Sequence, residues 1–385
     1  GVVEAYPQPE APDEAIDQAV ELINAAKRPY IYIGGGAAAV GMSQDIMALA
    51  EKIDACIGCS FMGLSAIPHD YERYLGMQGM HGQYASSMAN KEADLIIGVG
   101  VRFSDRATGN TAKYGKGAKI IQLDADLAEI NKNIKVDVGL IGDITSSFSR
   151  ILQRCQPQQH PEWQQQISEL KAEGQRISDE AERRATAPLT PRQIFEAINA
   201  VKDENTIIAT DVGQHQMWTA QHVTFQKPRK FASSGGLGTM GYGLGAAIGA
   251  AIATGERTVL ITGDGSFGMN LNELATAVAH KIPMVILLLN KIDLLKSKSE
   301  VLGIIQQYSE LYDFAEIIPI SVKNRINTDK ILPILEKYAV EGEHFFPDDI
   351  HRGFRQISVI RQDPFRSLCK FHNYHGVIFT GNGTN

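Results

Sequence analysis

The sequence is poor in cysteine and tryptophan and has no excess of positive charge. Four cysteines among 385 residues do not indicate a disulfide scaffold. The formal net charge of −7 gives no support to nucleic-acid or anionic-membrane binding, which depends on clustered Lys and Arg. No apolar run reaches the roughly 20 residues that a membrane-spanning helix needs. What remains is an ordinary globular protein with 44% hydrophobic and 21% charged residues, which we expect in the reducing cytoplasm.

Two of the cysteines, Cys56 and Cys59, form a C-x-x-C pair. A zinc site needs a second pair of Cys or His ligands at a matching spacing, and the sequence offers none. We therefore expect a buried, reduced pair, and a redox or metal role is the alternative.

The sequence also has no phosphate-binding loop of the form G-x-x-x-x-G-K-[ST]. Residues 109–117, "GNTAKYGKG", look similar, but their glycines are one residue too far apart. Gly117 also stands where a Ser or Thr is needed to bind Mg²⁺. A GTPase or ATPase of the P-loop type is therefore excluded as a working catalyst.

Apolar stretches that end in glycine or aspartate turns alternate with helical patterns in the first 156 residues. They occupy residues 28–36, 93–103 and 118–126. This alternation predicts an α/β domain with a parallel sheet over residues 1–156. The chain opens at Gly1 without a methionine or a signal-like segment, which we interpret as a fragment or a processed product.

A polar stretch with four prolines follows at residues 157–192 and predicts a connector that contains a helix. A second α/β unit begins at residue 193 and continues to "PMVILLLN", which ends at residue 290. We therefore expect the fold class α/β, with two doubly wound parallel-sheet domains.

The tetrapeptide "GDGS" directly follows the apolar strand "TVLI". Gly263 and Gly265 permit close approach of the backbone, and Asp264 lies where a carboxylate at the carboxyl end of a parallel strand can hold Mg²⁺. Ser266 and the N–H groups of the next helix would add donors to a diphosphate. An ordinary turn is the alternative for such a short motif.

Several longer motifs accompany this turn in a fixed order. In the second unit they are "DVGQHQMW" (211–218) and "SSGGLGTMGYGLGAAIGAA" (233–251); in the first they are "MGLSAIP" (62–68), the segment 76–110 and "LDADLAEINKN" (123–133). Together with "GDGS", they make residues 1–290 resemble the large catalytic subunit of acetolactate synthase, a thiamine-diphosphate enzyme. The resemblance divides this region into an FAD-type middle domain (1–156) and a truncated thiamine-diphosphate-binding domain (193–290).

The resemblance implies a transferase of branched-chain amino-acid biosynthesis. Such an enzyme joins two pyruvates, or pyruvate and 2-ketobutyrate, with loss of CO₂, and uses thiamine diphosphate, Mg²⁺ and FAD. It also implies a homo-oligomer with a regulatory small subunit. The glutamate that activates the cofactor belongs to the family's amino-terminal domain, which these residues do not include. We therefore name no catalytic residue and expect this chain to be inactive as a fragment.

The resemblance places Gln214 and His215 near the diphosphate, and Gly238 and Met240 at the hinge between the cofactor's two rings. Met240 would be the wedge that keeps the cofactor bent, and core packing is the alternative for it. The remaining cofactor positions are Gly263, Asp264, Gly265 and Ser266, with Asp264 as the metal ligand.

For FAD, which is largely structural in this family, the matching positions lie in the first domain. They are Gly34, Gly35, Gly36, Met80, His81, Arg102, Asp105, Arg106, Asp124 and Asp143. Taken alone, His81 would be an ordinary surface or core histidine.

From residue 290 the sequence resembles the end of an Era-type GTPase domain, over residues 291–349. Asn290 and Asp293 would bind the guanine edge, the Lys291 stem would cover the ring, and Ser321 would lie in the base-side loop. Without a phosphate loop we expect these positions to be vestigial.

Lys291 also replaces the second asparagine of the thiamine-diphosphate metal motif. Because a protonated amine offers no lone pair, we expect weakened Mg²⁺ binding.

A change of family at residue 290 suggests a chimera: a recombined, misassembled or artificial gene. Residues 350–385 have no pattern that assigns them to a fold, and a second junction or a shifted reading frame would explain them. The alternative function is a nucleotide-binding or interaction module with an Era-like end.

Overall fold

The computed structural model describes residues 8–185, 190–273, 276–277, 287–290, 318–319, 358–361 and 377–379. The chain divides into two compact units. Unit 1 comprises residues 1–184 and 224–229, and unit 2 comprises residues 185–223 and 230–385.

Unit 1 is built on a six-stranded parallel sheet in the order β3-β2-β1-β4-β5-β6. The strands are β1 (Pro29–Ile33), β2 (Cys56–Cys59), β3 (Tyr74–Met77), β4 (Leu95–Val99), β5 (Lys119–Asp124) and β6 (Val138–Ile141). The strand order reverses between β1 and β4, as in doubly wound folds that bind ligands at this switch point. The prediction of an α/β fold with parallel sheets is confirmed.

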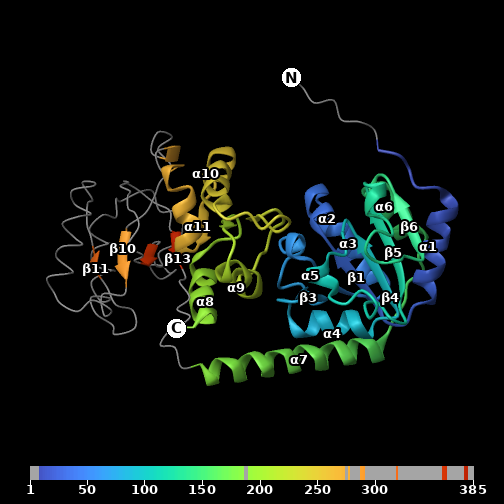
Figure 1. Cartoon of the computed structure of the whole chain (residues 1–385). Helices are drawn as coiled ribbons and strands as arrows, with labels where there is room; N and C mark the ends of the chain where they lie inside the picture. Colours follow the sequence, from blue (N-terminus) through green and yellow to red (C-terminus); the bar gives the residue numbers. More distant parts are fainter. Residues whose placement is uncertain are drawn as a thin grey trace, which may run out of the picture. The chain divides into compact units, whose positions relative to one another are not determined.

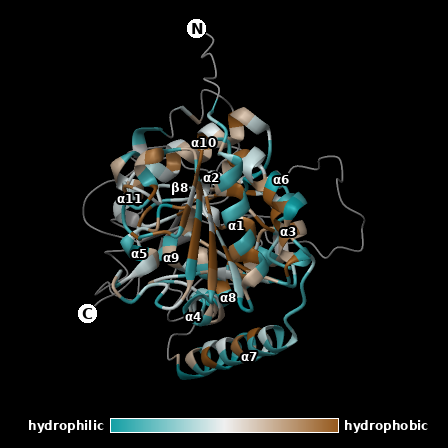
Figure 2. Ribbon diagram, turned by 90° about the vertical axis from the view of Figure 1, so that its right-hand side faces the viewer, coloured by the Kyte–Doolittle hydropathy of each residue, from teal (hydrophilic) through white to brown (hydrophobic). Residues whose placement is uncertain are grey.

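Helices cover both faces of this sheet. They are α1 (Asp13–Ala25), α2 (Gly35–Val40), α3 (Ser43–Lys52), α4 (Tyr84–Glu92), α5 (Asp105–Thr108), α6 (Ile144–Arg154) and α7 (Pro161–Arg184), with the 3-10 turns η1 (Phe61–Gly63) and η2 (Leu127–Glu129). Helices α1 and α3 contact α6, and α4 contacts α7 on the opposite face (Figure 1). Figure 2 shows apolar strands inside and polar residues on the outer side of α1, as burial of apolar surface requires.

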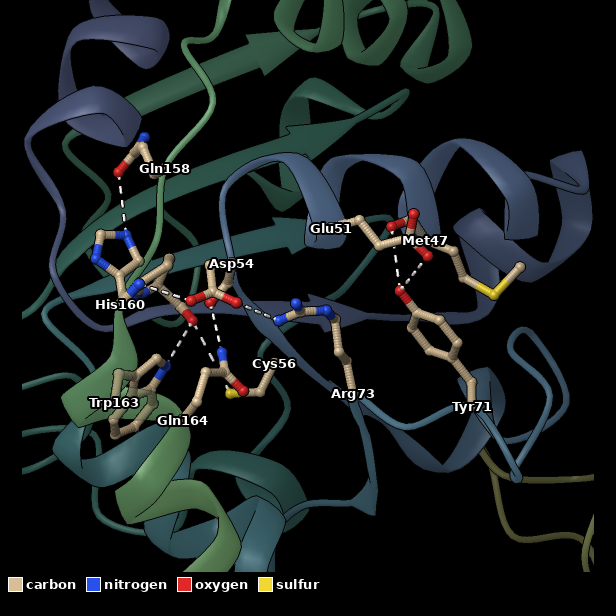
Figure 3. A network of polar contacts seen from close by, with 11 residues as sticks. Met47, Glu51, Asp54, Cys56, Tyr71, Arg73, Gln158, His160, Trp163 and Gln164 are labelled. Carbon is tan, nitrogen blue, oxygen red and sulfur yellow. Dashed lines mark hydrogen bonds and ion pairs between the residues drawn. The ribbon is translucent and has the colours of Figure 1, made fainter.

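Helix α7, which the sequence predicted as part of the connector, is anchored to unit 1. The Asp54 carboxylate accepts a hydrogen bond from the His160 backbone N–H (2.6 Å) and pairs with Arg73 (2.6 Å), as Figure 3 shows. The Asp54 carbonyl accepts a hydrogen bond from Gln164 Nε2 at 2.8 Å. Trp163 is buried in the core beneath the sheet. The start of α7 is therefore part of the packing of unit 1.

Unit 2 contains a four-stranded parallel sheet in the order β13-β9-β7-β8. Its strands are β7 (Ile207–Thr210), β8 (Phe231–Ser233), β9 (Thr258–Thr262) and β13 (Val377–Phe379), and its helices are α8 (Pro191–Val201), α9 (Gln214–His222), α10 (Tyr242–Thr254) and α11 (Asp264–Met269), followed by the 3-10 turn η3 (Leu271–Glu273). Helix α8 begins with a capping box: Thr190 and Gln193 exchange hydrogen bonds, and Pro191 opens the first turn.

The apolar segment that ends at residue 290 forms β10 (Leu287–Asn290), but not beside β9. It pairs in parallel with β11 (Ile318–Pro319) and β12 (Ser358–Arg361) in a separate three-stranded sheet. An apolar run predicts a buried strand without indicating its neighbours, because that choice depends on the surrounding chain. Within the described parts of the chain, no helix is both long enough and apolar enough to cross a membrane.

Candidate functional site

The carboxyl ends of β7 and β9 bring the predicted thiamine-diphosphate residues of unit 2 together. These strands are parallel neighbours, with Ile207 opposite Thr258. Helix α9 starts at Gln214 after β7, and α11 starts at Asp264 after β9. Because parallel strands end at one edge of a sheet, the "DVGQH" and "GDGS" motifs share that edge.

His215 lies between the backbones of two glycines at this edge. A Cβ added to Gly213 would lie 2.8 Å from His215 Cε1, and one added to Gly263 would lie 3.2 Å from it. The ring is 3% exposed, whereas Gln214 is exposed. Glycine is needed at both positions because any side chain there would displace the histidine ring.

Met240 lies close to the "GDGS" turn. A Cβ added to Gly265 would lie 3.6 Å from Met240 Cε. Met240 is 43% exposed and is therefore not part of the core. Gly238, two residues earlier, has a φ of +66° and donates its N–H to the Ser234 carbonyl at 3.0 Å. The loop therefore brings the predicted wedge to the predicted diphosphate turn.

Ser266 differs from the expectation that it would offer a donor to a diphosphate. Its side chain is buried, and its hydroxyl donates to the Val212 carbonyl at 3.1 Å. This hydrogen bond attaches the start of α11 to the end of β7. The hydroxyl proton is thus already used within the fold.

Asp211 is a residue that sequence reasoning missed. It is 0% exposed, and its carboxylate accepts hydrogen bonds from the Gly241 N–H (2.7 Å) and the Thr262 hydroxyl (3.3 Å). A buried carboxylate persists only where such donors compensate its lost hydration. The available signal was an aspartate directly after an apolar strand, but its partners lie 30 and 51 residues away.

In unit 1 the ten FAD candidates lie at or just after the carboxyl ends of β1, β3, β4, β5 and β6, and so share one edge of the sheet. The glycine run after β1 packs against the turn after β4. A Cβ on Gly34 would lie 2.0 Å from the Gly100 carbonyl oxygen, and one on Gly36 would lie 2.8 Å from Gly100 Cα. The N–H groups of Gly34 and Gly36 donate to Val99 (3.0 Å) and Gly100 (3.2 Å). A Cβ on the third glycine, Gly35, would lie 3.1 Å from Met62 Cβ.

The segment after β4 carries charged side chains into solvent. The side chains of Arg102 and Arg106 are 75% and 73% exposed, and Asp105 lies 4.0 Å from Arg106. The Met80 N–H donates to the Arg106 carbonyl at 2.9 Å, and the neighbouring His81 is half-buried. This part of the edge therefore presents two guanidinium groups to solvent.

Asp124, the last residue of β5, and Asp143, which follows β6, already accept hydrogen bonds from the backbone. Asp143 caps α6 by accepting from the N–H groups of Thr145 (2.8 Å) and Ser146 (3.1 Å). Asp124 accepts from the Asp126 N–H at 3.0 Å, and partial burial raises the pKa of the Asp124 carboxyl. Helix capping by itself explains why an aspartate occupies position 143.

Cys56 and Cys59 are free, buried thiols in β2. The Cys59 sulfur lies 3.0 Å from the Tyr74 hydroxyl, and burial raises the pKa of Cys59 to about 12. Among the residues that the structure describes, no group of three or more His, Cys, Asp or Glu side chains is arranged to hold a metal. The expected burial of both thiols is confirmed.

Comparison with known proteins identifies two domain families in the chain. Residues 16–151 match the thiamine pyrophosphate enzyme central domain, and residues 211–292 match the thiamine pyrophosphate enzyme C-terminal TPP binding domain. The chain is 37% identical to the acetolactate synthase isozyme 2 large subunit of Escherichia coli over 342 residues, 88% of this chain and 59% of that protein. It is 38% identical to the isozyme 1 large subunit of E. coli over 316 residues (82% and 54%). It is also 34% identical to the probable acetolactate synthase large subunit of Methanocaldococcus jannaschii over 357 residues (91% and 58%).

The chain thus spans little more than half the length of these relatives. Residues 1–290 are three quarters of its 385 residues. An alignment that covers 88% of the chain therefore has to include residues beyond 290. These comparisons give no support to the Era-type interpretation, which stays a prediction. Asn290 ends β10, and Lys291, Asp293 and Ser321 lie outside the described residues.

The matched segments contain the candidate sites of both units: the glycine turns of the first sheet lie in residues 16–151, and the His215, Met240 and Gly265 assembly lies in residues 211–292. The chain therefore carries the central domain and the C-terminal TPP-binding domain of the thiamine pyrophosphate enzymes.

Proposed function

We propose that the chain is part of an acetolactate synthase large subunit. The proposed reaction joins pyruvate to a second 2-keto acid, pyruvate or 2-ketobutyrate, with loss of CO₂, in branched-chain amino-acid biosynthesis. The observation that carries the proposal is the assembly of His215, Gly265 and Met240 at one sheet edge of the matched TPP-binding domain. Thiamine diphosphate, when bound, supplies the electron sink for decarboxylation.

The residues at this edge fit thiamine diphosphate. Gly265 is exposed and has no side chain, so an anion can approach the backbone at this position. Among the described residues, no side chain caps the amino-terminal end of α9, and the dipole of the helix favours negative charge there. The half-exposed Met240 offers an apolar surface to the rings of the cofactor. We propose Asp264 as the Mg²⁺ ligand; the resemblance assigns a second ligand to the position of Lys291, whose protonated amine offers no lone pair.

We propose a structural FAD site at the edge of the unit 1 sheet. The reversal of strand order between β1 and β4 and the exposed Arg102 and Arg106 support it. Since the N–H groups of Gly34 and Gly36 already donate within the protein, the guanidinium groups are the better candidates to bind a diphosphate.

The proposal extends to the assembly and to the activity of this polypeptide. The relatives are named large subunits, which supports a homo-oligomer with a regulatory small subunit. We propose that residues 1–385 without the domain that carries the activating glutamate form no acetolactate, and that lysine at position 291 weakens Mg²⁺ binding. We also propose that the gene is a chimera with a junction near residue 290, and that the guanine-binding positions after this junction are vestigial.

Titration calorimetry with thiamine diphosphate and Mg²⁺ tests the cofactor site. We expect binding to the unmodified chain and loss of it in Gly265→Val, because the new side chain would lie between the turn and Met240. Gly268→Val is the matched control: it lies in the same helix, and a Cβ there meets nothing within 4 Å. If both variants bind the cofactor equally well, the ligand does not occupy this turn.

A further inference from the structure

Gly241, which follows Met240, is held by hydrogen bonds to both its N–H and its carbonyl group. The Gly241 N–H donates to Asp211 Oδ1 at 2.7 Å, and the Gly241 carbonyl accepts from Asn270 Nδ2 at 2.5 Å. Asp211 follows β7, whereas Asn270 follows α11. Two side chains from separate segments therefore fix one glycine, an arrangement that we call the Gly241 clamp (Asp211, Gly241 and Asn270).

Only glycine fits this clamp. Gly241 has a φ of +88°, and a Cβ there would lie 3.1 Å from Asn270 Nδ2 and 3.2 Å from Met269 Cβ. Gly243 makes room for the other side of the clamp, since a Cβ on it would lie 2.9 Å from Asp211 Oδ2. The left-handed conformation is strained for residues with side chains, so the clamp requires glycine at position 241.

The clamp joins the segments that carry the proposed cofactor site. Met240 directly precedes Gly241, and its Cε reaches the Gly265 turn. Asp211 also accepts from Thr262, which precedes Gly263. Displacement of Gly241 would therefore move Met240 relative to the turn that we propose for the diphosphate. A cap that served only α10 would not require contacts to both segments.

We propose that Asp211 and Asn270 are positioning residues that hold Met240 against the ring portion of thiamine diphosphate. The inference rests on the proposed cofactor site and adds the residues that set its selectivity. Neither residue is expected to touch the reacting atoms. The clamp determines how strongly the site distinguishes thiamine diphosphate from a diphosphate without rings.

The test compares calorimetric affinities for thiamine diphosphate and inorganic pyrophosphate, both with Mg²⁺. Asn270→Ala removes the donor to Gly241, and we expect about tenfold weaker thiamine-diphosphate binding with unchanged pyrophosphate binding, as for one lost hydrogen bond. Asp211→Asn keeps an acceptor for Gly241 and should retain the preference. Asn272→Ala is the matched control, because Asn272 is exposed and bonds only to its neighbour Glu273 in the described structure.

Pyrophosphate binding also reports whether the site of each variant is folded. Equal loss of both ligands in Asn270→Ala would reduce the clamp to a structural role and overturn the inference. A wild-type preference that survives unchanged in Asn270→Ala would overturn it as well. A wild-type chain without any preference for thiamine diphosphate would instead refute the proposed cofactor site, and the inference with it.

Discussion

Both parallel sheets carry their candidate residues at the carboxyl ends of their strands, but the two edges use their polar groups differently. In unit 1 the glycine turn after β1 is packed against Gly100, and Asp143 caps a helix. In unit 2 the turn after β9 has space for a ligand at Gly265. The buried Asp211 accepts a hydrogen bond from Thr262, the residue before this turn. A glycine-rich turn can therefore mean close packing in one sheet and ligand access in the other.

The largest expected effect concerns the closed interior of unit 1. Burial raises the pKa of Cys59 to about 12. Against an ordinary thiol, its thiolate population at pH 8 is lower by a factor on the order of a thousand. We expect a disulfide reagent to leave Cys56 and Cys59 unmodified in the folded chain at pH 8, and to modify both in urea.

The measurement uses a Cys155→Ser, Cys369→Ser background, so that only the two β2 thiols report. Fast modification without denaturant would show that unit 1 opens readily and would remove the contrast between its packed edge and the open turn of unit 2.

The second prediction exchanges glycines between the two kinds of turn. Gly34→Val forces a side chain onto the Gly100 carbonyl oxygen and should destabilise unit 1 by about 3 kcal/mol. Gly265→Val meets only the end of the flexible Met240 and should change stability by less than about 1 kcal/mol. Scanning calorimetry of both variants measures the difference, and equal destabilisation would contradict the proposed contrast between the turns.

The third prediction compares the aspartates of the two edges. Asp211→Ala leaves the buried Gly241 N–H without its acceptor and should lower the free energy of unfolding of unit 2 by about 2 kcal/mol. Asp143→Ala removes a helix cap that solvent can partly replace, at about 1 kcal/mol. Urea unfolding measures the loss in free energy of unfolding for each variant. A larger loss in Asp143→Ala than in Asp211→Ala would contradict the prediction.

The smallest effect is expected at Lys291, where the resemblances to two families meet. If its position belongs to the metal site, Lys291→Asn supplies an oxygen ligand and should strengthen Mg²⁺-dependent thiamine-diphosphate binding by up to about tenfold. If it covers a guanine ring, the same change should weaken GDP binding. Calorimetry with both ligands gives opposite signs, and an unchanged thiamine-diphosphate affinity would refute the metal-ligand argument.

Patterns that are local in sequence predicted much of this molecule. The apolar runs around Tyr30, Ile97 and Ile121 became β1, β4 and β5, because continuous burial on both faces is typical of parallel strands. The short β2 was missed, since the four residues from Cys56 to Cys59 carry too little periodicity. Asp211 was missed because its role depends on Gly241, whose position follows only from the folded sheet.

The anchor at the start of α7 has a consequence for synthesis and folding. Asp54 and the His160 N–H are 106 residues apart in the chain, and Trp163 fills the core beneath Tyr30. Contacts at such separation form late, because a long loop has to close before they contribute. When a nascent chain has emerged only as far as residue 156, one face of the unit 1 sheet is incompletely covered. We therefore expect unit 1 to reach protease resistance during translation only after α7 has emerged, which arrest of synthesis before and after α7 would time.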